Sequence, residues 1–261
     1  MTNYIIDTHC HLNFEHLYRE LDNVLARAEE SGVKKFITIS VKIAEFKTIL
    51  DIANKYPNVY CAIGTHPNSA HEETHFGLEY IIQQCKHEKL VAIGETGLDY
   101  YYEKAAKDAQ KASFLKHIKA AQLTSLPLII HTRNADIDTI EILKQQIDQK
   151  RFNFVMHCYT SGLDLAQVAL HLGGYISFSG IATFKNAQQV RNIIKQIPLD
   201  RILIETDAPY LAPTPYRGKD NEPGYIVETA KYLSQYLEIE YQEFITITTK
   251  NALQLFTKIK Q

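Results

Sequence analysis

The fold of this chain is indicated first by its opening stretch, Tyr4-Ile5-Ile6-Asp7-Thr8-His9-Cys10-His11, an apolar run that ends in two histidines. A β-strand alternates its side chains, so positions two apart point to the same side. If residues 4–9 form a strand, His9 and His11 leave its C-terminal end with both imidazoles aimed at one place. Neutral imidazole is a common ligand of divalent metals. The pair alone decides little, because a histidine pair at a strand end is at least as often structural.

Short runs of the same kind recur along the chain. Three of them are apolar without polar alternation, namely Phe36–Ile39, Leu128–Ile130 and Ile202–Ile204. This pattern is typical of strands that are buried on both faces of a parallel sheet. Eight strands are expected, at Tyr4–Thr8, Lys35–Ser40, Val59–Gly64, Leu90–Glu95, Leu128–His131, Phe152–His157, Tyr175–Phe178 and Arg201–Glu205.

Longer segments with helical periodicity separate these runs. Examples are Leu17–Ser31, Ile43–Tyr56, Ala105–Thr124, Asp136–Gln149 and Ala187–Gln196. Eight successive strand-then-helix units predict an α/β fold, the (β/α)8 TIM barrel, with a doubly wound sheet as the alternative. Extra C-terminal helices are expected at Val227–Leu237 and Glu240–Lys258. Because no linker, repeat or low-complexity stretch divides the chain, residues 1–261 are expected to form a single domain.

Composition narrows the class of protein further. The 261 residues are 45% hydrophobic and 22% charged, which is ordinary for a globular protein. No apolar run approaches the ~18 residues that span a bilayer, and the N-terminus lacks signal-peptide features, so a cytoplasmic protein without membrane association is expected. The four cysteines show no Cys-x-x-Cys spacing and are expected to be free thiols. A net charge of −2 means that any polyanionic substrate is held by local charges or by metal.

Polar side chains follow most of the expected strands, at the face where a barrel of this kind carries its active site. The segments are His9-Cys10-His11, Gly64-Thr65-His66-Pro67, Gly94-Glu95-Thr96-Gly97-Leu98-Asp99, His131-Thr132-Arg133, His157 and Glu205-Thr206-Asp207-Ala208-Pro209. Six metal-binding side chains from five strands would then meet at one mouth: His9, His11, Glu95, His131, His157 and Asp207. An unpaired carboxylate at the end of an apolar strand costs several kcal/mol in desolvation, which either a metal or an arginine partner would offset; the histidines favour metal.

The number of donor side chains indicates whether the site holds one metal ion or two. Four imidazoles and two carboxylates exceed the three protein ligands of a typical single catalytic zinc. We expect a first ion on His9, His11, Glu95 and Asp207 and a second on Glu95, His131 and His157, with Glu95 bridging. Two ions ~3.5–4 Å apart activate a water and stabilise both oxygens of an in-line displacement, as phosphodiester hydrolysis requires.

Other residues are assigned supporting roles. Glu205 is expected on the same strand face as Asp207, where it either orients a ligand or forms a buried ion pair. Arg133 should share the side of His131 and suits a phosphate, although a salt-bridged surface arginine is nearly as common. His66 is expected to line the pocket rather than to bind metal. For the run Tyr100–Tyr102, packing is the commoner explanation and stacking of unpaired bases the alternative.

These segments together resemble the TatD family of metal-dependent hydrolases, within the amidohydrolase-type barrels. The matching stretches are Asp7–Leu12, Gly64–Pro67, Gly94–Tyr100, His131–Arg133, His157–Thr160, Glu205–Leu211 and Pro213–Pro223. They occur in the family's order over residues 7–223, so the resemblance covers nearly the whole chain. No expected metal ligand is missing.

The resemblance implies a barrel fold and divalent-metal hydrolysis, usually as a deoxyribonuclease, with metal roles at the six residues above. The expected activity is 3′–5′ exonuclease cleavage of single-stranded DNA or RNA, bound at the barrel mouth by a monomer or small homo-oligomer. Asp207 would orient the attacking water and accept its proton, Glu95 would bridge the ions, and Arg133, His66 and Arg217 would contact the substrate, with Lys219 beside Arg217. The family's usual cofactor is Mg²⁺; Mg²⁺ or Mn²⁺ is expected, with Zn²⁺ or Ni²⁺ as alternatives because imidazoles favour softer ions.

Two other functions remain open at this point. The first is an amidohydrolase-type deaminase or cyclic-amide hydrolase on the same barrel. Such enzymes often bridge two ions with a carboxylated lysine at the fourth strand, and Glu95 at that position favours the TatD interpretation. The second is a non-catalytic metal-bound scaffold, which loss of activity with metal retained in Asp207→Asn would exclude.

Overall fold

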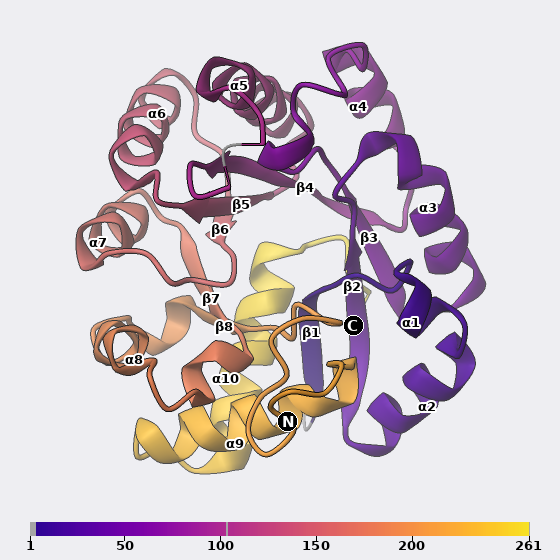
Figure 1. The fold of residues 1–261 in the computed structure, drawn as a ribbon, viewed down its shortest axis with the longest axis vertical. Helices are drawn as coiled ribbons and strands as arrows, with labels where there is room; N and C mark the ends of the chain where they lie inside the picture. Colours follow the sequence, from indigo (N-terminus) through magenta and orange to yellow (C-terminus); the bar gives the residue numbers. More distant parts are fainter. Residues whose placement is uncertain (1–3, 103, 261) are drawn as a thin grey trace.

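The computed structural model describes residues 4–102 and 104–260 and contains eight parallel strands that pair in chain order. Helices surround these strands, as Figure 1 shows in a view down the barrel. The predicted (β/α)8 barrel is therefore confirmed, and the doubly wound alternative is wrong because the strand order never reverses. The strands are β1 (Ile5–Cys10), β2 (Val33–Ile39), β3 (Val59–Ile63), β4 (Leu90–Asp99), β5 (Leu128–Arg133), β6 (Phe154–Met156), β7 (Tyr175–Phe178) and β8 (Ile202–Ile204).

Helices occur in every segment for which helix bounds are predicted, with shifts at most of their ends. The α-helices are α1 (Glu15–Tyr18), α2 (Leu21–Glu30), α3 (Phe46–Lys55), α4 (Leu78–Gln84), α5 (Lys107–Thr124), α6 (Asp136–Gln149), α7 (Leu163–His171), α8 (Gln188–Ile194), α9 (Ile226–Tyr236) and α10 (Tyr241–Leu255). Short 3₁₀ turns are η1 (Ile43–Glu45), η2 (Pro67–Ser69), η3 (Gly180–Thr183), η4 (Leu199–Arg201) and η5 (Pro223–Tyr225). The expected helix at 17–31 is divided into α1 and α2, whereas α6 has the predicted bounds, and α4 and α7 lie in segments for which no helix bounds are predicted.

The barrel closes between β1 and β8 through one isolated bridge, Cys10 with Ala208, and through side chains. The buried Asp7 carboxylate accepts hydrogen bonds from the Thr206 backbone N–H at 3.0 Å and from the Thr206 hydroxyl at 2.6 Å. The Asp207 N–H donates to the carbonyl of His9 at 2.9 Å. This seam therefore brings the residues that follow β8 against the end of β1.

Strand β4 is four residues longer than predicted, because it continues past Glu95 to Asp99. Gly94 and Gly97, which resemble turn glycines in the sequence, lie inside this strand with φ values of 135° and 140°. A Cβ at Gly97 would lie 2.0 Å from the His131 carbonyl oxygen, so only glycine allows β4 to approach β5 this closely. Pairing with β5 then resumes from Thr96 to Asp99.

Two apolar layers hold the barrel together. The larger layer lies mainly between the strands and the outer helices, and the smaller one fills the barrel interior. At the N-terminal ends of the strands, the last residues of α10 and those after it join the interior layer through Leu255, Phe256 and Ile259. This end is therefore sealed, and a site can open only at the opposite mouth. Within the described part of the chain, no helix combines the length and apolar character needed to cross a bilayer.

Candidate metal centre

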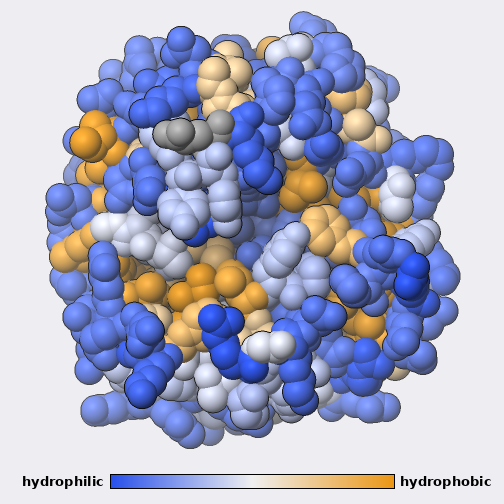
Figure 2. Space-filling model, viewed as in Figure 1, coloured by the Kyte–Doolittle hydropathy of each residue, from blue (hydrophilic) through white to orange (hydrophobic). Residues whose placement is uncertain are grey.

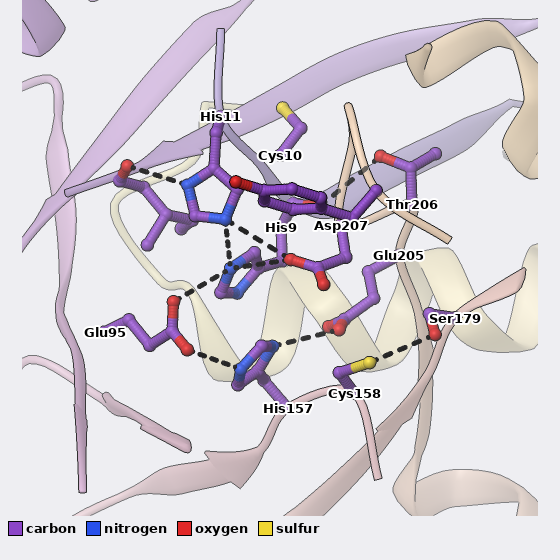
Figure 3. A network of polar contacts seen from close by, with 12 residues as sticks. His9, Cys10, His11, Glu95, His157, Cys158, Ser179, Glu205, Thr206 and Asp207 are labelled. Carbon is purple, nitrogen blue, oxygen red and sulfur yellow. Dashed lines mark hydrogen bonds and ion pairs between the residues drawn. The ribbon is translucent and has the colours of Figure 1, made fainter. Parts of the chain in front are cut away.

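All six predicted metal ligands meet at the C-terminal mouth of the barrel. His9 and His131 are inside β1 and β5, Glu95 is inside β4, and the other three follow a strand: His11, His157 and Asp207. Figure 3 shows Glu95 with its carboxylate between the rings of His9 and His157, while Asp207 points at His9 and His11. The sequence prediction that these groups converge is thus matched by the geometry.

Glu95 divides its two carboxylate oxygens between two groups of imidazoles. Its Oε1 lies 2.8 Å from Nε2 of His157 and 2.9 Å from Nδ1 of His131. Its Oε2 lies 3.4 Å from Nε2 of His9. The carboxylate is almost completely buried. One oxygen can therefore serve each of two adjacent cations.

The second group consists of His9, His11 and Asp207. The two Nε2 atoms are 3.3 Å apart, and Oδ1 of Asp207 is 3.3 Å from that of His11 and 3.5 Å from that of His9. Two imidazole nitrogens and a carboxylate oxygen thus face one point, and all three groups are mostly buried. A divalent cation can bind all three atoms at once, whereas a shared proton joins only two of them. Nδ1 of His9 is buried and has no hydrogen-bond partner among the described residues. The donor chemistry therefore fits a metal centre.

Two neighbouring groups contact the outer nitrogens of the histidine rings. Glu205 Oε1 lies 3.1 Å from Nδ1 of His157, a contact that suits both of its expected roles, orienting a ligand and forming a buried ion pair. The prediction that Glu205 shares a strand face with Asp207 is wrong. β8 ends at Ile204, and Asp207 has a left-handed backbone with φ of 57°. Nδ1 of His11 contacts the carbonyl of Ile39 at 3.3 Å.

Asp99 is a functional candidate that was not assigned from the sequence. Its Oδ2 lies 3.2 Å from Nε2 of His131, and its Oδ1 accepts the backbone N–H groups of Tyr101 and Tyr102 at 2.9 and 3.2 Å. The sequence does contain a signal for Asp99. If the strand continues past Glu95, then Glu95, Gly97 and Asp99 lie on the same face, because they are two residues apart. The predicted strand ends at Glu95, so it does not include Asp99, whereas β4 continues to Asp99.

The carboxylates dominate the electrostatics of the site. Burial favours neutral His157, but the charges of Glu95 and Glu205 raise its pKa well above the usual value. Burial opposes ionisation of Glu95, yet the surrounding histidines hold its pKa well below normal. For Asp207, burial is likewise outweighed by the hydrogen bond from His11, so its pKa is lowered. This negative field would equally attract metal cations.

His66 lies at the edge of this cluster. Its Nε2 is 3.5 Å from Oε1 of Glu95, and its ring centroid is 4.5 Å from that of His131. Burial lowers the pKa of His66 to about 3, so the ring is neutral at ordinary pH. Donor atoms of His66, Asp99 and His131 also lie within 4.8 Å of one another. The residue therefore adjoins the candidate metal ligands, and its predicted place in a substrate pocket stays a prediction.

The predicted substrate contacts are arranged unevenly. Arg133 continues β5 beyond His131, and its guanidinium carbon lies 3.9 Å from the ring centroid of Tyr101 and 4.8 Å from that of Tyr102. No carboxylate partner of Arg133 occurs among the described residues. Tyr100 differs from its neighbours, because its hydroxyl donates to Asp138 at 2.5 Å.

The cations of the loop after β8 lie against aromatic rings. Arg217 stacks on Phe184, with its guanidinium carbon 3.8 Å from the ring centroid, and Lys219 lies 5.7 Å from the centroid of Tyr216. Both side chains are exposed. Neither makes a contact with the six candidate metal ligands in the described structure. The role of Arg217 and Lys219 in holding substrate therefore stays a prediction.

A parallel barrel with a mouth of histidines and carboxylates defines the class of metal-dependent hydrolases with an amidohydrolase-like fold. The sequence model of the TatD related DNase family matches residues 6–257. The chain therefore belongs to this family.

Relatives along the whole length support this assignment. The metal-dependent hydrolase YabD of Bacillus subtilis is 39% identical over 252 residues, covering 97% of this chain and 98% of that protein. The metal-dependent hydrolase YcfH of Escherichia coli K12 is 38% identical over 256 residues, covering 97% and 96%. The crystal structure of YJJV, a TatD homologue from E. coli K12, superposes with a TM-score of 0.92 at 29% identity, covering 98% of this chain and 99% of that chain. The protein is accordingly a metal-dependent hydrolase, in agreement with the resemblance seen in the sequence.

Proposed function

We propose that this hydrolase domain, residues 1–261, is a 3′–5′ exonuclease that removes nucleotides from single-stranded DNA or RNA with two divalent cations. The observation that carries the proposal is the position of Glu95, whose two oxygens face two separate sets of imidazoles at 2.8–2.9 Å and at 3.4 Å. A bridging carboxylate between two cation positions is the arrangement used for in-line displacement at phosphorus.

The proposed ligand sets follow the geometry. His9, His11, Asp207 and Glu95 Oε2 would hold one cation, and Glu95 Oε1, His131 and His157 would hold the other. When bound, the two cations would lower the pKa of water and neutralise charge on the phosphate oxygens. Mg²⁺ or Mn²⁺ is the proposed working cofactor, while the imidazoles also suit Zn²⁺ or Ni²⁺.

The chain itself supplies orientation and proton transfer. Asp207 keeps a second oxygen, Oδ2, beside the Oδ1 that faces His9 and His11, so it can orient a water and accept its proton. The pKa of Asp207 is lowered, so its carboxylate is ionised at neutral pH and has a lone pair free to take up a proton. Nδ1 of neutral His66 accepts the Asn68 N–H, so Nε2 carries the proton and can donate one hydrogen bond to a phosphate oxygen without adding charge.

Support for a nucleic-acid strand comes from the mouth. Tyr101 and Tyr102 are 54% and 51% exposed, and Arg133 lies over both rings, so a cation and two aromatic faces are presented together. Aromatic faces beside a local cation are what single-stranded nucleic acids bind. The family description, TatD related DNase, favours the same class of substrate.

The test uses purified protein with its metal removed and then replaced. Linear single-stranded, linear double-stranded and circular single-stranded DNA, each labelled, are incubated with Mg²⁺, Mn²⁺, Zn²⁺ or Ni²⁺. We expect stepwise shortening of the linear single strand only, with mononucleotide products and no cut in the circle. Cleavage of the circle would contradict the exonuclease assignment.

Two further measurements separate the alternatives. Ammonia release from amide or nucleobase substrates without phosphodiester cleavage would instead indicate a deaminase or cyclic-amide hydrolase. Asp207→Asn is expected to retain at least one metal equivalent and to lose most of the activity. A wild-type protein that binds two metal ions and hydrolyses no substrate in the panel would be a scaffold.

A further inference from the structure

A second aromatic cluster lies across the mouth from Arg133. Phe14 follows β1 and Tyr210 follows β8, and their rings are 5.8 Å apart at an interplanar angle of 87°. The Phe14 ring lies 5.0 Å from the imidazole of His11 at 21°, and the Tyr210 ring lies 6.3 Å from it. Tyr210 is 53% exposed. Aromatic surface open to solvent therefore directly adjoins the metal centre.

These two rings line a cavity of about 600 Å³ whose charge is unusual for a nucleic-acid site. Among its described lining residues are the carboxylates Glu15, Glu45 and Asp220, one histidine, and neither lysine nor arginine. Glu15 is paired with Arg19 outside the lining, and Asp220 lies 3.8 Å from His16. A phosphodiester chain would be repelled here, whereas an uncharged base and sugar would not.

The cavity beside Arg133 has the opposite character. It measures about 650 Å³ and is lined by Arg133 and Lys107. Both of its carboxylates are already engaged, Asp138 with Lys111 at 2.8 Å and Asp136 with a backbone N–H at 2.8 Å. β5 is four strands from β1 in the barrel order, so the two cavities stand on opposite sides of the metal centre. Figure 2 shows the hollow that this mouth forms in the middle of the face.

We infer that the cavity of Phe14 and Tyr210 binds the terminal nucleoside of the strand, while the rest of the strand runs past Arg133. The inference rests on the proposed function and adds to it the position of the strand end. Only a terminal nucleoside lacks a further phosphate, and it therefore suits a lining that has carboxylates and neither lysine nor arginine. The cavity volume is within the range of small-molecule pockets, roughly 300–1,000 Å³.

This placement also determines the bond that is cut. The scissile phosphate lies between the two cavities, at the metal centre. Water adds its oxygen to phosphorus, the bond to the 3′-oxygen of the shortened chain breaks, and that oxygen takes up a proton. The phosphate therefore leaves with the terminal nucleoside, as a 5′-mononucleotide.

The test compares two single-stranded oligonucleotides, labelled at the 5′ end, that differ only at the 3′-terminal residue. One has an ordinary thymidine and the other an abasic sugar. Wild-type protein, Tyr210→Leu and Phe14→Leu are assayed for removal of that residue with the metal ion that supports the highest activity. Tyr18→Leu is the matched control, since Tyr18 is 52% exposed on α1 and is absent from this cavity.

The wild-type protein is expected to prefer the ordinary end roughly tenfold, which is the scale of one base stacked on an aromatic ring. Tyr210→Leu and Phe14→Leu should reduce this ratio toward one, and Tyr18→Leu should keep it. A wild-type ratio near one, or a ratio that both variants retain, overturns the inference while leaving the exonuclease proposal intact. Failure to shorten either oligonucleotide overturns the proposed function, and the inference with it.

Discussion

Asp99 joins the candidate metal ligand His131 to the aromatic turn at the mouth: its Oδ2 lies 3.2 Å from Nε2 of His131, and its Oδ1 accepts the N–H groups of Tyr101 and Tyr102. His131 in turn presents Nδ1 to Glu95 at 2.9 Å. One buried carboxylate therefore contacts both the ring of His131 and the turn that carries the rings beside Arg133.

Asp99→Asn should weaken metal binding more than it weakens folding. The amide keeps an oxygen for the backbone N–H groups but removes the charge that faces His131. Loss of such an outer partner typically reduces metal affinity or activity about 10–100-fold. Titration calorimetry of the metal-free protein measures the effect, and Asp51→Asn, an exposed change beside Lys47, is the control. Unchanged metal affinity would show that His131 is oriented without Asp99.

Glu95→Gln should reduce the number of bound metal ions. The bridging role requires negative charge on both oxygens, and an amide offers only one oxygen and no charge. We expect fewer than two equivalents of metal by elemental analysis and a loss of activity of at least about 100-fold, since the two-ion arrangement stabilises the displaced oxygens. Two tightly bound ions in the variant would contradict the bridging assignment.

Gly97→Ala should destabilise the barrel severely. Its new Cβ would lie 2.0 Å from the backbone oxygen of His131, so β4 and β5 would have to separate. Gly173→Ala is the matched control, because Gly173 also has a positive φ, 92°, but no atom within 4 Å of the new Cβ. The control should cost about 1–2 kcal/mol of unfolding free energy from its backbone conformation alone, and Gly97→Ala clearly more. Equal urea midpoints for the two variants would show that the clash is relieved.

His117 should make the protein less stable as the pH falls. Its ring is completely buried; Nε2 accepts the Thr65 N–H at 3.2 Å and Nδ1 donates to the Ser113 carbonyl at 2.7 Å. Burial lowers its pKa to about 4 from 6.5. Below pH 6.5 the unfolded chain binds a proton at this histidine, whereas the folded protein does not bind it until the pH falls to about 4. The contribution of neutral His117 to the free energy of unfolding is therefore complete above pH 6.5 and falls by about 3 kcal/mol between pH 6.5 and 4.

The measurement for His117 compares urea unfolding at pH 7 and pH 4.5 in the wild type and in His117→Gln, which keeps an acceptor for Thr65. The variant should lose less stability over this interval, because it lacks the titrating ring. Equal pH dependence in both proteins would contradict the assignment. Using the metal-free form of both proteins removes the pH dependence of metal binding, and the candidate metal ligands then titrate alike in the wild type and in the variant.

Much of the fold follows from local patterns in the chain. Buried apolar runs such as Leu128–Ile130, alternating with helical segments, are enough to predict the barrel, because parallel strands covered on both faces need that composition. The polar residues that follow those runs predict the six converging ligands, because strand ends in this fold share one mouth. These inferences need only the chain order of strand and helix.

Tertiary structure decided what depends on contacts between distant segments. The extension of β4 past Glu95, and with it the role of Asp99, depends on pairing with β5 through Gly94 and Gly97, which the sequence shows only as turn-like glycines. The position of Tyr210 against Phe14, 196 residues away, depends on the seam between β1 and β8. Local preference fixes which elements form, whereas the direction of each loop side chain is set by packing that no single segment encodes.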